Sequence, residues 1–487
     1  MPSMSENKKV KSLPKSPTGI QGMDEITGGG LPKGRPTLVA GSAGCGKTLF
    51  AMEFLVNGAT QHDEPGVFVA FEENADELAQ NVASLGFDLK DLIRKKKLII
   101  DYVRVERTEI EETGDYDLEG LFIRLGHAID TIGAKRVVLD TVEVLFSALT
   151  NQGILRAELQ RLFRWLKDKG VTAVITAERG DGTMTRFGLE EYIADCVILL
   201  DHRVTEQIST RRMRIVKYRG TLHGTNEYPF LITRNGISVL PITSLGLDHE
   251  VSNERVSTGI PELDEMLGNK GFYRGTSILI SGSAGSGKTS LAASIVEAAC
   301  LRGERCLYFT FEESPAQIIR NMNSIGIDLA PHRKKGLLRF HATRPALYGL
   351  EMHLVTLHDL IREMEPHVVV LDPITDFGVV GSEADVKSAV TRIIDLLKMR
   401  QITALFTSLV SEDEGTDRSI VGVSSLIDAW ISLRNIESNG ERHRGLFILK
   451  ARGMSHSSHI RSFHLTDDGI LIGEMDMATR RAATESS

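Results

Sequence analysis

Apolar and polar positions along the chain follow two alternating patterns. Short, near-continuous apolar runs rich in β-branched residues predict strands buried on both faces, and longer segments with helical apolar spacing predict helices. Such strands occur at 36–41, 66–71, 98–103, 136–140 and 172–177, and such helices at 48–61 and 154–170. Buried strands that alternate with helices are typical of a mainly parallel sheet with helices on both faces, so we expect a three-layer α/β fold. The pattern does not give the order of the strands.

The whole pattern occurs twice. The segment "GSAGCGKT" at 41–48 returns as "GSAGSGKT" at 282–289, and "VFVAFEEN" at 67–74 returns as "LYFTFEES" at 307–314. Lys47 and Lys288, at the same place in the two copies, are 241 positions apart. This period is far longer than that of a solenoid repeat, so it indicates a duplicated domain.

The join between the copies lies in a polar segment without apolar periodicity, "LGLDHEVSNERVSTGI" at 245–260, as expected for a linker. The predicted organisation is a disordered lead at 1–15, a first domain at 16–246, a linker at 247–256, a second domain at 257–472 and a flexible tail at 473–487.

Composition narrows the class of protein. Among 487 residues, 41% are apolar and 25% are charged, which is the profile of a soluble globular protein. No apolar stretch approaches the roughly 18 residues of a membrane span, and the N-terminus lacks the apolar core of a secretory signal. Four scattered cysteines without a CxxC pair fit a reducing cytoplasm. A net charge of −8 disfavours a main role in coating nucleic acid, and basic patches at 94–97 and 211–214 are interpreted as solvated faces or subunit contacts.

Both repeated glycine-rich segments fit the phosphate-binding pattern GxxxxGK[ST], and each lies between a predicted strand and a predicted helix. In this context the backbone N–H groups surround phosphates, Lys47 and Lys288 reach the β- and γ-phosphates, and the hydroxyls of Thr48 and Thr289 ligate Mg²⁺. Two matches in register make an accidental glycine-rich turn a poor explanation. The predicted ATP-binding residues are Gly41, Ser42, Ala43, Gly44, Cys45, Gly46, Lys47, Thr48 and Leu49, and Gly282, Ser283, Ala284, Gly285, Ser286, Gly287, Lys288, Thr289 and Ser290.

Carboxylates follow the strands that should end beside these loops. Asp140 and Asp372 each end an apolar strand, where a carboxylate associated with magnesium belongs, although it could instead cap the next turn. The pairs Glu72-Glu73 and Glu312-Glu313 could orient water or accept a proton, or one glutamate of each pair could cap the following helix. The predicted metal-associated residues are Thr48, Asp140, Thr289, Glu312 and Asp372, and the predicted catalytic residues are Glu72, Glu73, Glu312 and Glu313.

With these motifs in place, the chain resembles the KaiC family of circadian-clock ATPases and autokinases over about residues 15–470. The marks are "TGI…LDE" before each phosphate loop, "FEE" after it, and "KYRGTLHG…EYPF" at the end of the first copy. The resemblance implies tandem RecA-like P-loop domains in a double-ring homohexamer, with ATP between subunits and further stacking to a dodecamer left open. It also implies that the first domain hydrolyses ATP while the second phosphorylates itself. Residues implied to contact a neighbour's nucleotide are Lys217 and Arg219 in the first ring and Arg444, Lys450 and Arg452 in the second.

The predicted phosphoacceptors differ between the copies. Asp195 to Lys217 and Asp428 to Lys450 both span 22 positions, so these segments align without gaps. Ser424 and Ser425 then fall on the family's acceptor pair, where the first copy has Glu191 and Tyr192. A fixed carboxylate cannot switch, so only the second copy is predicted to carry a phosphate. Without the resemblance, the two serines read more simply as a turn or helix cap. The resemblance also implies that Ser419, which matches another family position, influences which neighbour is modified.

Some features depart from the family, and other functions stay open. Pro373 follows Asp372, and the next stretch has no arginine where relatives can carry one, so we expect the contacts across the second ring to differ from those of such relatives. The tail puts binding of KaiA in doubt, whereas a KaiB-like partner of the first ring is expected. One alternative is a RecA-type DNA-dependent ATPase, but no aromatic-and-basic cluster typical of single-strand binders is seen, and nucleic-acid binding is not expected. Another alternative is a nucleotide-gated scaffold without phosphotransfer.

Overall fold

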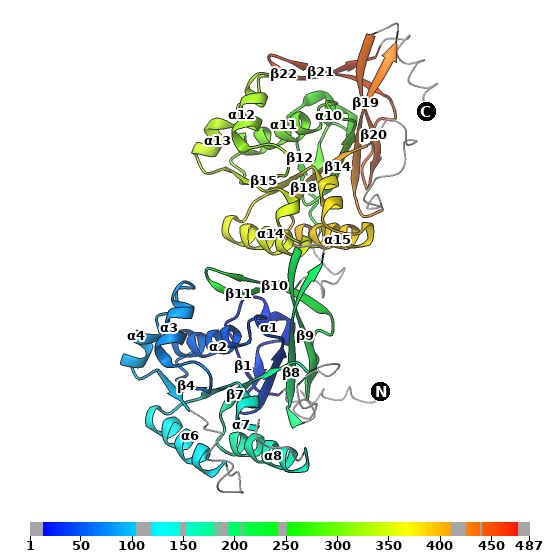
Figure 1. Cartoon of the computed structure of the whole chain (residues 1–487). Helices are drawn as coiled ribbons and strands as arrows, with labels where there is room; N and C mark the ends of the chain where they lie inside the picture. Colours follow the sequence, from blue (N-terminus) through cyan, green and yellow to red (C-terminus); the bar gives the residue numbers. More distant parts are fainter. Residues whose placement is uncertain are drawn as a thin grey trace, which may run out of the picture. The chain divides into compact units, whose positions relative to one another are not determined.

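The computed structural model describes residues 13–103, 118–146, 152–180, 185, 193–205, 208–241, 251–410, 425–438 and 441–475. The chain divides into two compact units, 1–244 and 245–487. Each unit contains one nine-stranded sheet and a separate two-stranded ribbon among its described residues (Figure 1).

The first unit starts with a small ribbon and then alternates strands with helices before it closes with four consecutive strands. Its elements are β1 (Lys15–Ser16), α1 (Met23–Thr27), β2 (Leu31–Pro32), β3 (Pro36–Gly41), α2 (Lys47–Gln61), β4 (Gly66–Ala70), α3 (Ala75–Ala83), α4 (Leu89–Arg94), β5 (Leu98–Tyr102), α6 (Glu119–Ile132), β6 (Arg136–Asp140), α7 (Val142–Phe146), α8 (Gln152–Asp168), β7 (Thr172–Glu178), β8 (Cys196–Thr205), β9 (Ile208–Tyr218), β10 (Glu227–Thr233) and β11 (Gly236–Val239).

The sheet of this unit has the order β11-β10-β9-β8-β3-β7-β6-β4-β5. The strands from β8 to β5 pair in parallel, and those from β8 to β11 pair antiparallel. Neighbouring residues of a strand face opposite ways, so Val39 packs into one core with Phe50 and Phe54 of α2. Leu38 and Ala40 pack into a second core with Leu159 of α8. Two cores, one on each face of the sheet, make the three layers.

The second unit repeats this plan. Its elements are β12 (Arg255–Val256), α10 (Pro261–Met266), β13 (Phe272–Tyr273), β14 (Ser277–Gly282), α11 (Lys288–Leu301), β15 (Cys306–Thr310), α12 (Pro315–Asn323), α13 (Ala330–Lys334), β16 (Leu338–Ala342), η2 (Pro345–Leu347), α14 (Leu350–Met364), β17 (Val368–Asp372), η3 (Ile374–Val379), α15 (Glu383–Met399), β18 (Thr403–Leu409), β19 (Ala429–Ser438), β20 (Glu441–Ala451), β21 (Arg461–Thr466) and β22 (Gly469–Glu474).

The second sheet runs β16-β15-β17-β18-β14-β19-β20-β21-β22, which is the same order read from the other edge. In both units the strand before the phosphate loop, β3 or β14, lies in the middle of the sheet with parallel neighbours on both sides. The predicted tandem α/β fold with mainly parallel sheets is therefore confirmed, and the strand order that the pattern left open is now given. In the described residues, no helix is long and apolar enough to cross a membrane.

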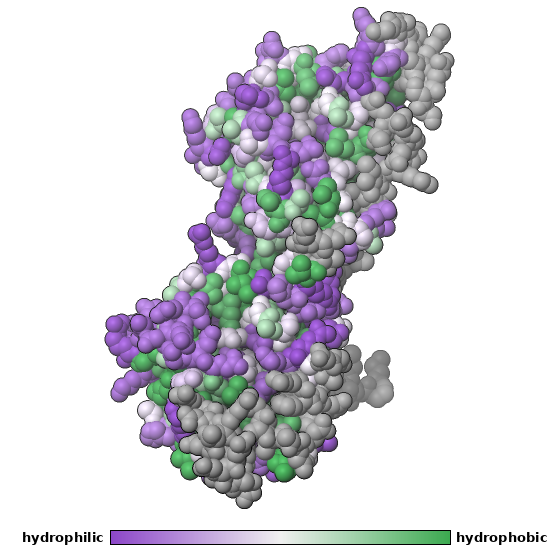
Figure 2. All heavy atoms as spheres, in the orientation of Figure 1, coloured by the Kyte–Doolittle hydropathy of each residue, from purple (hydrophilic) through white to green (hydrophobic). Residues whose placement is uncertain are grey.

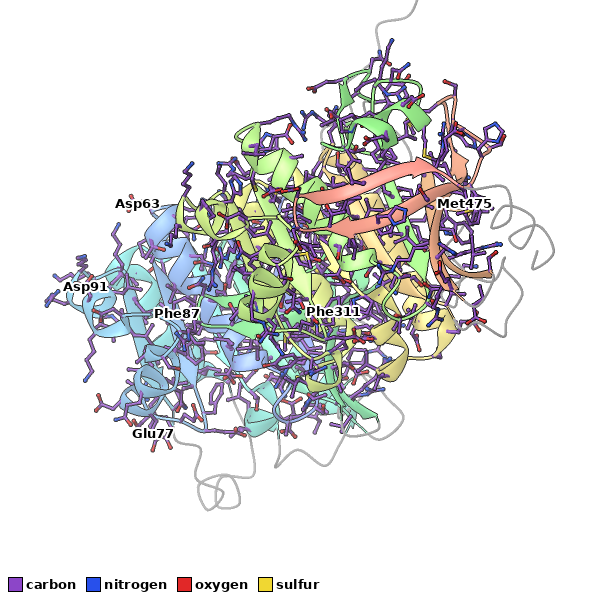
Figure 3. All side chains as sticks on the ribbon, turned by 90° about the horizontal axis from the view of Figure 1, so that it is seen from above. Asp63, Glu77, Phe87, Asp91, Phe311 and Met475 are labelled. Carbon is purple, nitrogen blue, oxygen red and sulfur yellow. The ribbon has the colours of Figure 1, made fainter. Side chains whose placement is uncertain are left out.

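The basic segment at 94–97 lies at the end of α4. Lys95 pairs with Asp91 at 2.6 Å, and Arg94 and Lys97 pair with Asp91 and Asp63 respectively. Figure 2 shows hydrophilic side chains gathered over α3 and α4, and Figure 3 places Asp63 and Asp91 at the outer edge of this unit. These contacts fit the interpretation of this patch as a solvated face.

A buried carboxylate joins the phosphate-loop helix α2 to the hairpin β10–β11. Glu53 of α2 is 3% exposed, and its Oε2 accepts a hydrogen bond from the backbone N–H of Ile237 at 2.8 Å. Burial raises the pKa of Glu53 to about 7, against the weaker lowering effects of hydrogen bonds from Ile237 and Asn57. The carboxyl group therefore binds its proton more tightly in the folded chain than in the unfolded one.

Replacing Glu53 with Gln is expected to stabilise the first unit at pH 8. Because the folded pKa is raised, the free energy of unfolding is highest below the unfolded pKa and falls as pH rises through about 7. Glutamine keeps an acceptor for Ile237 without the charge, so we expect a gain of about 1–3 kcal/mol at pH 8 and little change at pH 4.5. Thermal unfolding at both pH values measures this, and an equal gain or loss at both would contradict it.

Candidate functional site

The two phosphate loops have matching backbone conformations. Gly46 and Gly287, directly before the helix-starting lysines, have φ values of 104° and 102°, in the left-handed region that favours glycine. Lys47 donates from Nζ to the carbonyl oxygens of Gly41 and Ser42 at 2.9 and 3.0 Å. Lys288 makes the equivalent bonds to Gly282 and Ser283 at 2.9 and 2.8 Å. Each lysine is therefore held within its own loop, at the N-terminus of α2 or α11.

The phosphate loop of the second unit borders a cavity of about 460 Å³. Burial lowers the pKa of Lys288, while the nearby carboxylates of Asp372 and Glu312 raise it. The cavity therefore brings a buried cation and acidic groups together. Of the residues predicted from the sequence, those that line it are Ala284, Gly285, Gly287, Lys288, Thr289, Ser290, Glu312, Glu313 and Asp372.

Not every loop side chain is placed to contact a ligand. The side chains of Cys45 and Ser286 are fully buried. A Cβ on Gly41 would lie 2.5 Å from Cys45 Sγ, and one on Gly282 would lie 2.5 Å from Ser286 Oγ. These two side chains therefore pack beneath their loops, where they support the backbone. Among the described residues, all four cysteines are free and buried.

Asp140 is fixed at the end of β6 by hydroxyl groups. Its carboxylate accepts hydrogen bonds from Thr176 on β7 and from Thr48 of the phosphate loop. Burial raises the pKa of Asp140, and these hydrogen bonds and Lys47 oppose that rise. The predicted pair Thr48 and Asp140 is thus in direct contact, and two oxygen ligands beside a phosphate site suit Mg²⁺, which keeps several water or phosphate ligands.

Asp372 has the equivalent place at the end of β17, where Thr407 matches Thr176 of the first unit and Tyr308 is an additional partner. Tyr308 on β15 donates its hydroxyl to Asp372 Oδ2 at 2.7 Å, and Thr407 on β18 donates to Oδ1. Asp372 and Thr289 line the same cavity, so these oxygen atoms also fit a magnesium ion. Sequence reasoning missed Tyr308, Thr176 and Thr407 as partners because each lies on a neighbouring strand far along the chain. Among the described residues, no group of three or more His, Cys, Asp or Glu side chains is placed to hold a metal ion alone.

The glutamate pairs follow β4 and β15 and lie next to these aspartates. The backbone N–H of Phe71 donates to the Asp140 carbonyl at 3.1 Å, and that of Phe311 donates to the Asp372 carbonyl at 3.0 Å. The first glutamate of each pair comes directly after these contacts. Burial raises the pKa of Glu72, as do the charges of Asp140 and Glu178, and Lys47 opposes them. The charges of the aspartate and the lysine of the first phosphate site therefore both act on Glu72.

Other residues cap the helices that follow these glutamates, so the alternative role of the glutamates as helix caps does not apply. Helix α3 is capped by Asn74, which forms a capping box with Glu77, and α12 is capped by Ser314 with Gln317. Glu73 instead accepts a hydrogen bond from Asn81 Nδ2 at 3.2 Å. The caps leave the carboxylates of Glu72 and Glu312 available for other roles.

One acidic residue near the second site was not singled out from the sequence. Asp376 lies in η3, four positions after Asp372. Burial raises its pKa to about 6, with a contribution from the charge of Glu312 that Arg344 opposes. The matching position of the first unit is Val144, so this extra carboxyl group distinguishes the second site. Its only signal in the sequence was this difference between the copies.

The basic residues that the resemblance places against a neighbour's nucleotide lie on or next to β9 in the first unit and β20 in the second. Only those of the second unit can be compared with the described cavity. Lys450, Arg452 and Arg444 are not among the residues that line it. The Arg219 guanidinium lies 3.7 Å from Asp195, and Arg452 donates to the carbonyl of Ser425 at 2.6 Å. Lys217 and Lys450 occupy the strands β9 and β20 at matching positions opposite β8 and β19.

The predicted acceptor segment is only partly described. Ser424, Ser419, Glu191 and Tyr192 lie outside the described residues. Ser425 is exposed in a turn three positions before Asp428. The Asp428 carboxylate accepts hydrogen bonds from Ser277 N and Oγ at 3.0 and 2.7 Å and from Lys398 at 2.8 Å.

The fold and the doubled phosphate loop define a class, tandem P-loop nucleotide-binding domains of the RecA-like kind. Residues 16–244 and 256–477 both match the family model described as "ATPase: KaiC", so the chain belongs to the KaiC family of ATPases.

Three relatives illustrate this membership. The chain is 59% identical over 469 residues to "Circadian clock protein KaiC2" of Synechocystis sp. (strain ATCC 27184 / PCC 6803 / Kazusa), covering 96% of this chain and 83% of the relative. It is 39% identical over 467 residues to "Circadian clock oscillator protein KaiC" of Parathermosynechococcus lividus, covering 95% and 86%. It is 36% identical over 480 residues to "Circadian clock protein KaiC3" of the same Synechocystis strain, covering 96% and 93%.

Proposed function

We propose that both halves bind ATP with magnesium, that residues 16–246 hydrolyse it, and that residues 257–472 transfer its γ-phosphoryl group to Ser424 and Ser425. The observation that carries this proposal is the repeated arrangement of loop lysine, loop threonine, strand-end aspartate and glutamate pair in both units. Only the second unit has paired hydroxyls at the acceptor position. Through its clock relatives, the chain is assigned a timing or signalling role.

In the proposed reactions, Lys47 and Lys288 exchange their loop carbonyl partners for the phosphates of ATP. Thr48 with Asp140, and Thr289 with Asp372, would hold magnesium, and a bound magnesium ion would supply positive charge that neutralises developing negative charge. Glu72 orients a water molecule and accepts its proton, so that ADP and phosphate are the products. Glu312 accepts the Oγ proton of Ser424 or Ser425 while a new P–O bond to Oγ forms and the bond from Pγ to the bridging oxygen of ADP breaks.

The proposed assembly is a homohexamer in which Lys217 and Arg219, and likewise Arg444, Lys450 and Arg452, contact the nucleotide of a neighbouring subunit. A KaiB-like protein is the proposed partner of the first ring, and KaiA is not proposed as one. We place the protein in the cytoplasm.

A phosphate on Ser425 would act on contacts that the structure describes. It would add about −1.5 to −2 charges next to Arg452, whose guanidinium is already 2.6 Å from the Ser425 carbonyl. An arginine this close can pair with a phosphate through charge-assisted hydrogen bonds. Phosphorylation is therefore expected to reposition Arg452 and to change how it meets a neighbouring subunit.

Phosphate mapping tests the proposal. Purified protein is incubated with Mg-ATP, and phosphorylated residues are mapped by mass spectrometry in the wild type and in a Ser424→Ala/Ser425→Ala variant. We expect phosphate on the two serines in the wild type and none in the variant. Phosphate that persists in the variant would show that the acceptors are wrongly assigned, and its absence from both proteins would contradict the autokinase activity.

A further inference from the structure

The strand next to the phosphate loop makes polar contacts in the second unit that differ from those of the first. Strand β19 pairs in parallel with β14, which leads into the loop. Trp430 donates from Nε1 to Ser281 Oγ at 2.7 Å, and Asn435 donates from Nδ2 to Ser283 Oγ at 2.7 Å. Asp428, directly before β19, also accepts two hydrogen bonds from Ser277, the first residue of β14. Hydrogen bonds therefore connect β19 and the residue before it to β14 and to the loop that follows.

The contact at Ser283 is the one that reaches the phosphate loop itself. Ser283 is the second residue of "GSAGSGKT", and its carbonyl oxygen accepts the hydrogen bond from Lys288 at 2.8 Å. Asn435 therefore fixes the side chain of Ser283, and the backbone carbonyl of Ser283 in turn binds Lys288. When Lys288 leaves this carbonyl oxygen to bind phosphate, the hydrogen bond from Asn435 to Ser283 can still fix the backbone at this end of the loop.

The first unit lacks this arrangement at the matching positions. Strands β8 and β19 align with an offset of 233, and β3 and β14 with an offset of 241, so Trp430, Ser281 and Asn435 match Val197, Ala40 and His202. His202 shares a hydrogen bond of 2.7 Å with Ser209 on β9, away from the loop. Ser42, the match of Ser283, keeps its hydroxyl, so the difference lies on the neighbouring strand.

We propose that Asn435 is a positioning residue of the second nucleotide site, which holds the phosphate loop through Ser283 in the conformation that binds ATP. Preorganised loops bind ligands more tightly because less order must be imposed on binding. This inference rests on the proposed binding of ATP by the loop and goes beyond it, since it assigns a role to a residue of β19 that is not among those lining the cavity.

A binding experiment on the full chain tests the inference. Affinity for a fluorescent ATP analogue is measured, and the second-site part is defined as the part that Lys288→Ala removes. Asn435→Ala is expected to weaken second-site binding about three- to tenfold, the scale of one net hydrogen bond. The same loss is expected for the matching ADP analogue, because the contact acts through the loop. The matched control His202→Ala should leave both sites unchanged.

A double-mutant cycle separates positioning from general destabilisation. Ser283→Ala should lose about as much affinity as Asn435→Ala, and the double variant should lose no more than either single variant. Additive losses, or equal losses from His202→Ala, would overturn the inference. Should Asn435→Ala fail to fold, unaltered affinity in Ser283→Ala would overturn it as well. If Lys288→Ala removes no binding at all, the proposed ATP site is wrong. If Lys288→Ala removes second-site binding but Asn435→Ala leaves it unchanged, only the positioning role of Asn435 is wrong.

Discussion

Replacing Glu72 with Gln is expected to lower ATP hydrolysis by the full chain at least tenfold while ATP binding persists. Glutamine keeps the size of the side chain but cannot accept a proton, and general-base catalysis is worth about 10²–10⁴ in rate. Phosphate release at saturating ATP, together with binding of a slowly hydrolysed analogue, measures both parts of this prediction.

The pH profile gives an independent test of the same residue. The pKa of Glu72 is raised, chiefly by burial and then by Asp140 and Glu178. A base must be unprotonated to act, so hydrolysis should fall as pH decreases through this raised pKa, at higher pH than an ordinary glutamate would give. The matched control is Glu77→Gln, which changes an exposed carboxylate that caps the adjacent helix α3. Unchanged hydrolysis in Glu72→Gln, or an equal loss in Glu77→Gln, would remove Glu72 from the catalytic role.

Substitution of the two loop lysines should remove the two ATP sites one at a time. Lys47 and Lys288 are each only 8% exposed and are held by two loop carbonyls, so each places a buried positive charge where phosphates bind. Loss of one partner from a buried charge pair typically weakens binding about thirtyfold or more. We therefore expect Lys47→Ala and Lys288→Ala each to reduce the stoichiometry from two ATP per chain to one.

Equilibrium binding of a non-hydrolysable ATP analogue measures this stoichiometry. Lys90→Ala serves as the control, because Lys90 is an exposed lysine whose ion pair with Asp76 lies on the surface. Two sites that persist in either loop variant would contradict the assignment of that loop. A single site in the wild type would contradict the claim that both halves bind ATP.

Much of the fold could be predicted because the signals are local. The buried runs that became β3, β4 and β6, and the helix α2 that follows the first loop, each carry their pattern within a few residues. The motif also identifies Lys47 and Thr48 because the chemistry of the loop depends on residues adjacent in sequence. Strand order could not be predicted, because pairing between β3 and β8 joins segments that are about 160 residues apart.

In the candidate site, too, only the residues with a local sequence signal could be predicted. Asp140 and Glu72 are recognisable because each follows a buried strand, but the groups that fix and tune them lie on other strands. Tyr308 meets Asp372 across a separation of 64 residues, and Asn435 meets Ser283 across 152. Single-sequence patterns do not report such long-range polar contacts. The extra carboxyl of Asp376 was visible only as a difference between the copies.

The most direct test of the division of labour follows the γ-phosphoryl group itself. Protein is incubated with ATP labelled in the γ-phosphate, and the label is quantified on the peptide that contains Ser424 and Ser425 in the wild type, in Glu72→Gln and in Glu312→Gln. We expect the label on this peptide to be retained in Glu72→Gln and lost in Glu312→Gln. Undiminished label on these serines in Glu312→Gln would contradict this expectation.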